Sequence, residues 1–591
     1  MEGTDRARRD KPKLPLILAA SVVQGWALYG LHESIKSHHW PATHHAWLFA
    51  LYALTVFVPL TIQLTADYAR RTALWWMTTL LGAAVFYFGW HWGSEVSDPS
   101  DRRLDPFGTV FSGAFPLGLL WLMALPFAQC YLSTGRWVGR YDSLFTCAWR
   151  NKLVLAEAAL FTGFFWLLLT LWQTLFHMLR VDFFRELFEE PIFVYPVTSL
   201  AFGCALHLIG SVDRLTSAIL EQVLNVLKWL ALLTGCILAF FTLALLYDLP
   251  GLAFTGRRAI NATWLLWLVA VMVLLLNAAY RDGLDSRPYP KWIARALRAV
   301  VPLTAVIAVT ALYALTVRAR EYGLTVERFW GFVVCGAALA YAVGYSVSAF
   351  DRSGWMRGVA RVNVGVALAL IAVMSAALTP LLSPYRLAAD SQFKMAQQPA
   401  PDPANGWKSP VHYLHFDSGR YGRQRLQQLA GLLGAGNEQI RRHAQESLLQ
   451  ESPWMNDMSI DAPGLLAKLQ IYPAGRALDA KLSAEIAADL RKPEYAFLFQ
   501  RFSEQGVAGI FIDLNGDDAQ DFVLLGWQGG VAYENKAGEW AIVGRFYTNS
   551  MKAGPWSAVV SDLKAGNYTA QQQRWRDLNI GTRHFRFNPN D

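Results

Sequence analysis

Apolar residues are concentrated in long runs over the first two thirds of the chain and become sparse after residue 383. A helix needs about 20 residues to cross the hydrocarbon core of a bilayer. Eleven runs approach or exceed that length, at residues 14–31, 45–66, 72–92, 109–133, 153–179, 191–210, 223–247, 259–280, 299–317, 331–350 and 362–383. The pattern predicts a polytopic α-helical membrane protein with eleven transmembrane helices.

Basic residues predict the orientation of these helices. Lys and Arg are enriched in short loops on the cytoplasmic side of a membrane. In the membrane half they are more numerous in the N-terminal segment, which holds Arg6, Arg8 and Arg9, and in every second loop after it. This predicts an N-terminus inside and a C-terminus outside. The first run also follows a basic stretch as a signal peptide does, but no small-residue cleavage site follows it, and whether it is cleaved is left open.

Beyond residue 383 the chain has the composition of a soluble domain. Residues 384–410 are rich in Pro and polar residues and predict a linker between a transmembrane domain, residues 1–383, and an extracytoplasmic domain, residues 411–591. Helical spacing of apolar residues occurs at 423–433, 439–449 and 481–490. Short β-branched and aromatic runs follow at 507–513, 521–526, 530–533 and 540–547. The domain is therefore expected to be α+β.

Composition agrees with a membrane protein. The 591 residues carry a net charge of +8, yet 54% are hydrophobic and only 17% are charged. A basic nucleic-acid-binding domain is excluded by that balance, and the lipid bilayer is the expected partner of the basic cytoplasmic loops. The five cysteines all lie in the membrane half without C-x-x-C spacing, so the outer domain has no disulfide framework.

The most specific local motif lies between two predicted strands. Oxygen-bearing side chains stand at positions 1, 3, 5 and 9 of a loop, with a backbone carbonyl available at position 7: Asp513, Asn515, Asp517, Asp521 and the carbonyl of Ala519. Calcium prefers six to eight oxygen ligands, which such a loop supplies. Residues 513–521 resemble the calcium loops of integrin-type FG-GAP repeats, and that resemblance implies a structural Ca²⁺ ligated by these five residues. A hairpin turn with solvated carboxylates is the alternative.

Histidines are concentrated in the first external loop. Five of the twelve lie within residues 32–45, and two more, His91 and His177, fall near external helix ends. Imidazole binds zinc, copper and nickel, although the spacing matches no named metal motif. An outer-face enzyme that uses this loop is one hypothesis. Histidines that only fill the membrane boundary are the other.

Two ionisable residues lie within predicted membrane helices. Glu157 and His207 are on the fifth and sixth helices, which a short external connection should make antiparallel neighbours. Ionisable side chains in a membrane are costly and usually face a partner or a cavity. A proton relay in a secondary transporter is one interpretation, and a static polar contact is another.

An external turn at Tyr322–Thr325 is flanked by charged residues, namely Arg320, Glu321, Glu327 and Arg328. We expect these charges to pair across the turn. The turn is either a structural cap or a docking point for the C-terminal domain.

Four segments of the membrane half resemble a bacterial polytopic membrane family catalogued as domain of unknown function 4153. These segments are Asp182–Phe188, Pro191–Thr198, Leu276–Gly283 and Glu321–Arg328. The resemblance spans most of residues 1–390. It implies a bacterial inner-membrane protein and no established activity.

No nucleophile elbow, P-loop, dinucleotide fingerprint or zinc-protease motif occurs in the sequence. The leading hypothesis is a non-enzymatic envelope sensor, binding or scaffold protein with a periplasmic or extracellular domain that calcium stabilises. Its partner would be an envelope protein or a ligand at the outer face, and not nucleic acid.

Overall fold

The computed structural model divides the chain into two compact units, Met1–Leu448 and Leu449–Asp591. It describes residues 14–96, 113–211, 213–255, 262–281, 289–350, 356, 358–398, 409–432, 437–448, 461–490, 495, 499, 506–526, 529–536, 538–547, 556–568, 578–580 and 583–585. The division falls later than the predicted linker of residues 384–410, because helix α15 (Pro384–Met395) begins inside that linker and packs with the first unit.

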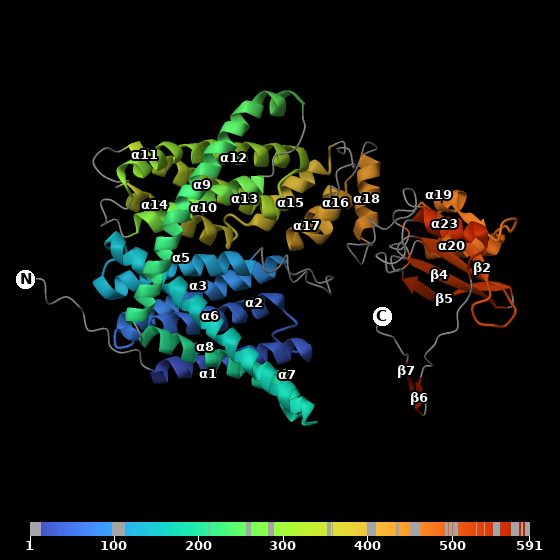
Figure 1. The fold of residues 1–591 in the computed structure, drawn as a ribbon, viewed down its shortest axis with the longest axis horizontal. Helices are drawn as coiled ribbons and strands as arrows, with labels where there is room; N and C mark the ends of the chain where they lie inside the picture. Colours follow the sequence, from blue (N-terminus) through green and yellow to red (C-terminus); the bar gives the residue numbers. More distant parts are fainter. Residues whose placement is uncertain are drawn as a thin grey trace, which may run out of the picture. The chain divides into compact units, whose positions relative to one another are not determined.

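Eleven helices of the described chain are long and apolar enough to cross a membrane, in agreement with the eleven predicted (Figure 1). They include α1 (Leu14–Lys36), α2 (His45–Leu64), α3 (Thr72–Val96), α5 (Phe115–Thr134), α6 (Tyr141–Met178), α8 (Pro191–Ser211), α9 (Asp213–Thr255), α10 (Ala262–Tyr280), α12 (Leu303–Tyr322), α13 (Val326–Phe350) and α14 (Val359–Ala377). Shorter helices join them: the 3-10 turn η1 (Ala66–Tyr68), α7 (Phe183–Glu189) and α11 (Lys291–Val300). The chain is therefore a multi-pass membrane protein.

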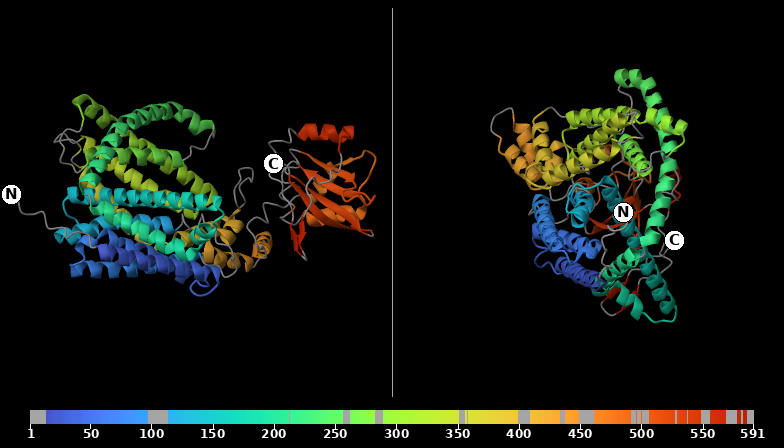
Figure 2. Two further views of the ribbon diagram at one scale, coloured as in Figure 1. Left: turned by 60° about the horizontal axis from the view of Figure 1, so that its bottom comes forward. Right: turned by 90° about the vertical axis from the view of Figure 1, so that its left-hand side faces the viewer.

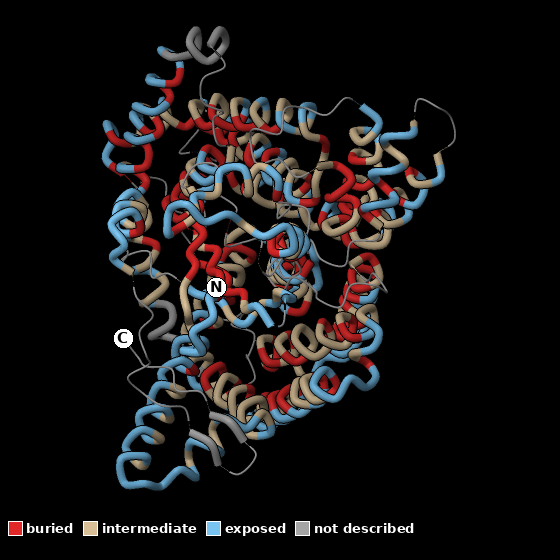
Figure 3. Tube along the Cα trace, turned by 90° about the vertical axis from the view of Figure 1, so that its right-hand side faces the viewer, coloured by how far each residue is buried: buried red, intermediate tan, exposed pale blue. Residues whose placement is uncertain are grey.

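The membrane helices form two lobes. Helices α1, α2, α3, α5, α6 and α8 pack on one another as lobe 1, and α9 to α14 pack as lobe 2 around one continuous apolar core (Figures 1 and 2). The lobes meet where α5 packs on α14 and where α6 packs on α9. Exposed positions cover the outside of this helical part (Figure 3). They include apolar residues such as Leu167, Leu168 and Leu171 of α6, as expected for a helix whose outer surface contacts lipid.

Small residues allow the helices of lobe 1 to approach closely. A Cβ added at Gly25 of α1 would lie 2.5 Å from the Cα atom of Pro196 in α8, and one at Gly93 of α3 would lie 2.5 Å from the carbonyl oxygen of His45. Close approach of backbones through small residues is a general feature of membrane helix packing.

Four helices follow the membrane helices and pack into a small bundle that we call the cap: α15, α16 (Pro410–Phe416), α17 (Gly419–Ala430) and α18 (Glu438–Leu448). Its core is formed by buried apolar residues, namely Ala389, Val411, Leu414, Leu426, Leu429 and Ala444. The Arg425 guanidinium also donates to the Asp390 carboxylate at 2.6 Å, which joins α17 to α15. The cap belongs to the first unit.

The second unit is built on a five-stranded sheet of order β1-β2-β3-β4-β5. Its strands are β1 (Gln470–Tyr472), β2 (Val507–Ile512), β3 (Asp521–Gly526), β4 (Gly529–Lys536) and β5 (Glu539–Tyr547). Strand β1 is parallel to β2, and the other pairs are antiparallel. A separate two-stranded sheet joins β6 (Leu578–Ile580) to β7 (Arg583–Phe585).

Helices cover both faces of the five-stranded sheet. Side chains alternate along β2, so Phe511 faces helices α19 (Ala462–Lys468) and α20 (Ala480–Asp489), whereas Ile510 faces α23 (Trp556–Ala565). Figure 2 shows α23 (red) beside the sheet. A mixed sheet with helices is thus confirmed for the second unit, but the helices predicted near 423–433 and 439–449 correspond to α17 and α18 of the first unit.

Candidate functional site at the junction of the cap and the lobes

The cap is hydrogen-bonded to the loop that joins α12 to α13 in lobe 2. Ser391 Oγ accepts from the Leu324 backbone N–H at 2.8 Å, and the Gln392 side-chain amide donates to the carbonyl oxygens of Tyr322 and Leu324 at 3.0 and 3.1 Å. The turn at Tyr322–Thr325 is therefore a docking point for the cap.

Charged residues beside this turn do not pair across it in the way the sequence predicted. The described part of the chain shows no ion pair among Arg320, Glu321, Glu327 and Arg328. The Arg328 guanidinium donates instead to the backbone carbonyl oxygens of Tyr322, at 3.1 Å, and Gly323. Arg328 therefore pairs with backbone carbonyl groups of the turn and not with the carboxylates of Glu321 or Glu327.

Tyr413 of α16 makes a further contact with lobe 2. Its buried hydroxyl accepts a hydrogen bond from the backbone N–H of Val326, the first residue of α13, at 2.8 Å. The first N–H groups of a helix have no partner within the helix, so this hydroxyl caps α13. Burial, with the nearby Glu327 carboxylate, raises the pKa of Tyr413 well above its usual value, so the hydroxyl remains neutral.

On lobe 1 the cap touches the end of α3. Gly419, the first residue of α17, has a φ of 53° and lies directly against the backbone of Glu95. A Cβ at this position would be 2.1 Å from the Glu95 carbonyl oxygen. Only glycine satisfies both the left-handed backbone and the close approach. The contact also brings the positive N-terminal end of one helix to the negative C-terminal end of another, which is favourable.

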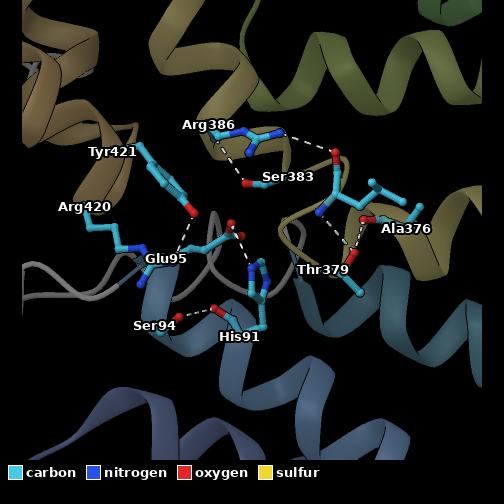
Figure 4. A network of polar contacts seen from close by, with 10 residues as sticks. His91, Ser94, Glu95, Ala376, Thr379, Ser383, Arg386, Arg420 and Tyr421 are labelled. Atoms are coloured by element: carbon cyan, nitrogen blue, oxygen red, sulfur yellow. Dashed lines mark hydrogen bonds and ion pairs between the residues drawn. The ribbon is translucent and has the colours of Figure 1, made fainter.

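Figure 4 shows the charged side chains near the end of α3, namely Glu95 with Arg386 and Arg420 of the cap. The carboxylate of Glu95 lies 3.5 Å from Nε2 of His91, one turn earlier in α3, and both side chains are almost fully buried. Arg386 of α15 and Arg420 of α17 both act electrostatically on Glu95. Lobe 1 therefore contributes a buried carboxylate, and the cap contributes two guanidinium groups.

Several polar atoms of this cluster are buried without a hydrogen-bond partner among the described residues. They are Oε1 of Glu95, both ring nitrogens of His91, Nε of Arg420 and the indole nitrogens of Trp92 and Trp330. Lifting the cap from lobe 1 would separate Arg386 and Arg420 from Glu95 and break the backbone contact at Gly419, so the junction couples the two parts.

The sequence contained a detectable pattern for this cluster. His91 and Glu95 stand four residues apart at the end of the third apolar run and so share one helix face. Their partners Arg386 and Arg420 are almost 300 or more positions away, and periodicity cannot connect them.

The predicted calcium residues form the loop between β2 and β3. Asp513 accepts backbone N–H groups from Asn515, Gly516 and Asp518 at 3.2, 2.6 and 3.1 Å. These donors, that of Gly516 first, lower the pKa of Asp513. The first carboxylate of the loop therefore holds the turn together.

The remaining loop residues also bond within the loop or near it. Asp521 accepts the Leu514 N–H at 3.0 Å, Asp517 accepts that of Ala519 at 2.9 Å, and the Asn515 amide donates to Asp517 at 3.0 Å. Burial raises the pKa of Asp521. Within the described ranges no three His, Cys, Asp or Glu side chains are arranged to hold a metal ion. The calcium site at this loop stays a prediction.

The histidines of the first loop have different contact partners and do not form one cluster. Nδ1 of His32 pairs with the Tyr195 hydroxyl at 3.1 Å, and His44 pairs with Thr43 at 3.0 Å, while His38 and His39 are exposed. His177 lies 2.6 Å from Asp182. Of all these histidines, only His91 belongs to the junction cluster.

Comparison of the chain with protein-family models, curated proteins and solved structures found no match. The resemblances to the polytopic family and to FG-GAP loops stay predictions. What the fold defines is the class: a multi-pass membrane protein of two helical lobes with a cap, followed by a separate unit built on a mixed sheet.

Proposed function

We propose that this protein is a bacterial inner-membrane protein whose C-terminal part lies outside the cytoplasm, binds an envelope protein or ligand there without catalysing a reaction, and passes that binding to both lobes through the cap. One observation carries the proposal. The cap contacts lobe 2 through Ser391, Gln392 and Tyr413, and it contacts lobe 1 through Gly419.

The physical argument is one of mechanical constraint. A ligand shifts a conformational equilibrium only when it distinguishes between two arrangements. Because the cap is attached to both lobes, movement of one lobe against the other would disturb either the contact at Gly419 or the hydrogen bonds of Ser391, Gln392 and Tyr413. A partner that pulls on or stabilises the cap therefore acts on the lobes as well.

The proposed orientation rests on the basic loops and on the position of the docking loop. The cap binds residues 322–326, which the charge pattern assigns to the outer face. Calcium at the β2–β3 loop would stabilise the outer domain, since extracellular sites of even 10⁻⁴–10⁻³ M affinity are filled.

Cysteine labelling tests the orientation. Gln427→Cys on the exposed side of α17 should react with a membrane-impermeant maleimide in intact spheroplasts. The matched variant Arg136→Cys, in the exposed connection between α5 and α6, should react only after permeabilisation. The opposite pattern would overturn the assignment.

Photo-crosslinking tests the binding. A benzophenone amino acid at Val543, which is 52% exposed on the edge strand β5, should give a discrete membrane-associated adduct in cells. The same group at Leu168, whose exposed side faces lipid in our assignment, is the control. Absence of any adduct from Val543 and from further exposed positions of the second unit would argue against partner binding.

A further inference from the structure

A second group of unpartnered polar atoms lies in lobe 1, in the half of its helices away from the cap. Oε1 of Gln63 in α2, Oε1 of Glu157 in α6 and Nδ1 of His207 in α8 are all buried without a hydrogen-bond partner in the described chain. Buried polar atoms are nearly always hydrogen-bonded, and each exception calls for an explanation such as a water or an ion. Because these three atoms lie on three neighbouring helices, we look for one explanation that applies to all of them.

Glu157 and His207 lie at the same depth. Trp166 of α6 donates to the Thr198 hydroxyl of α8 at 3.0 Å, which fixes the register of these antiparallel helices. Glu157 precedes Trp166 by nine residues, and His207 follows Thr198 by nine. Because both helices rise about 1.5 Å per residue, the two side chains reach the same level. The predicted common depth is thus supported, although neither side chain is bonded to the other.

Apolar packing at this level confirms the register. Val154 and Ala158 of α6 pack on Ala205 and Leu206 of α8, and Leu64 of α2 packs against them. Gln63, the residue before Leu64, is therefore close to this level on the third helix.

The hydrogen bonds of Gln63 show which of its atoms is free. Its amide nitrogen donates to Ser21 Oγ at 3.1 Å, and Ser21 in turn lies against Gly203 of α8. His207 is one helical turn, about 6 Å, further along α8. The nitrogen of Gln63 is thus used, and its carbonyl oxygen remains as an acceptor.

Oε1 of Glu157 has no hydrogen-bond partner on the described helices that pack on α6. Helices α5, α7, α8 and α9 pack on α6. These helices have six described side chains that are charged or can be protonated near neutral pH: Arg185, Glu186 and Glu189 of α7, His207 of α8, and Glu221 and Lys228 of α9. The α7 residues follow the far end of α6, Glu221 is exposed, and Lys228 lies over the rings of Trp229 and Tyr289. On α6 itself, Lys152 lies over Trp149.

We propose that Gln63, Glu157 and His207 form an intramembrane binding site for a small monovalent cation, either an alkali metal ion or a hydronium ion. One carboxylate oxygen, one amide oxygen and one imidazole nitrogen are acceptors for such an ion, and a single carboxylate matches a single positive charge. Ionisable residues inside a membrane commonly mark ion pathways. The site is separate from the partner binding proposed at the outer face, and it would give the protein an ion-binding activity in addition.

Thermal unfolding of the full-length protein in lipid nanodiscs tests the site, with tryptophan fluorescence as the readout. An ion that binds only the folded state raises the melting temperature. The wild type is compared in sodium, potassium and choline chloride at fixed pH, and then over a pH series in choline chloride. The variant is Glu157→Gln, and the control is Glu186→Gln, which removes the same charge from an exposed position of α7.

We expect the wild type to gain several degrees from an alkali ion or from acidification, and Glu157→Gln to lose that gain while melting no lower than the wild type in choline. A gain from sodium or potassium at fixed pH identifies an alkali ion, and a gain from acidification alone identifies hydronium. A structural role predicts instead that Glu157→Gln melts lower in every buffer. Equal ion and pH responses in the wild type and Glu157→Gln would overturn the proposal.

A second variant keeps the test decisive if Glu157→Gln does not fold. Gln63→Leu retains the carboxylate and removes one acceptor oxygen, so the concentration of ion needed for half the melting shift should rise by about tenfold or more, the loss expected for one charge-assisted contact. Gln129→Leu, which removes a paired amide between α5 and α6, is its control. Equal ion responses in these two variants would also reject the site.

Discussion

Replacing Gly419 by alanine should loosen the cap from lobe 1 and leave the rest of the fold intact. The residue has a φ of 53°, and the new Cβ would lie 2.1 Å from the Glu95 carbonyl oxygen and 3.1 Å from its carbonyl carbon. The neighbour is backbone at the end of a membrane helix, so it cannot move aside as a flexible side chain would.

Two terms set the magnitude. A left-handed backbone costs a non-glycine residue about 1–2 kcal/mol, and an overpacked contact costs about 1–3 kcal/mol. Together they weaken the attachment of the cap to lobe 1 by roughly 2–5 kcal/mol. The lower figure already raises the population of the detached cap by about 25-fold, since about 1.4 kcal/mol corresponds to a factor of ten.

Hydrogen exchange measured by mass spectrometry on the protein in nanodiscs is the assay. Peptides from α15, α16 and α17 should exchange faster in Gly419→Ala, and peptides from β2 to β4 should not change. Gly431→Ala is the matched control at the other end of α17, where φ is −97° and the nearest atom to a new Cβ is 3.5 Å away. If the two variants exchange at the same rate, the Gly419 contact does not hold the cap.

Two further predictions concern the other side of the cap and the β2–β3 loop. Tyr413→Phe should leave the Val326 N–H buried without an acceptor, which costs about 1–3 kcal/mol. Hydrogen exchange should therefore become faster in residues 322–330 but not at the end of α3. The control is Tyr421→Phe, and the same exchange rates in both variants would contradict this prediction. Because the folded-state pKa of Asp521 is raised by burial, its contribution to stability is complete below the unfolded pKa of about 3.9 and is lost as the pH rises through the folded value. In EGTA, the hydrogen-exchange rates of β2 and β3, corrected for the intrinsic pH dependence of exchange, should therefore increase with pH. Calcium should reverse this increase in the wild type but not in Asp521→Asn. The same effect of calcium on both proteins would rule out the calcium site.

The membrane helices and most of the sheet could be predicted because their sequence patterns are local. A run of apolar residues fixes both the burial and the helical length, and alternation along residues 507–512 places Phe511 and Ile510 on opposite faces. Strand β1 has only three residues and a parallel partner 38 positions away in register, Gln470 with Ala508, so no local pattern indicated it.

The grouping of the cap with the membrane lobes could not be predicted in this way. Its helices have the polar surfaces of a soluble domain, so α15 was predicted as part of the linker of residues 384–410, and the later cap helices were predicted to belong with the sheet. What joins them to the lobes is a few contacts between distant positions, such as Tyr413 with Val326, 87 residues apart. One of these contacts, at Gly419, is made by a residue without a side chain.

The way in which the cap binds the docking loop determines which residues of that loop can be replaced. Ser391, Gln392 and Tyr413 recognise backbone amides and carbonyls of residues 322–326, so the side chain of Leu324 is not itself the group recognised. The side chain at position 324 can therefore change without loss of these hydrogen bonds, whereas Gly323 cannot, because its φ is 73° and an added Cβ would lie 2.6 Å from the Gln392 amide nitrogen. What the junction requires of the sequence is thus the hydroxyl and amide groups of the cap and the two glycines at 323 and 419.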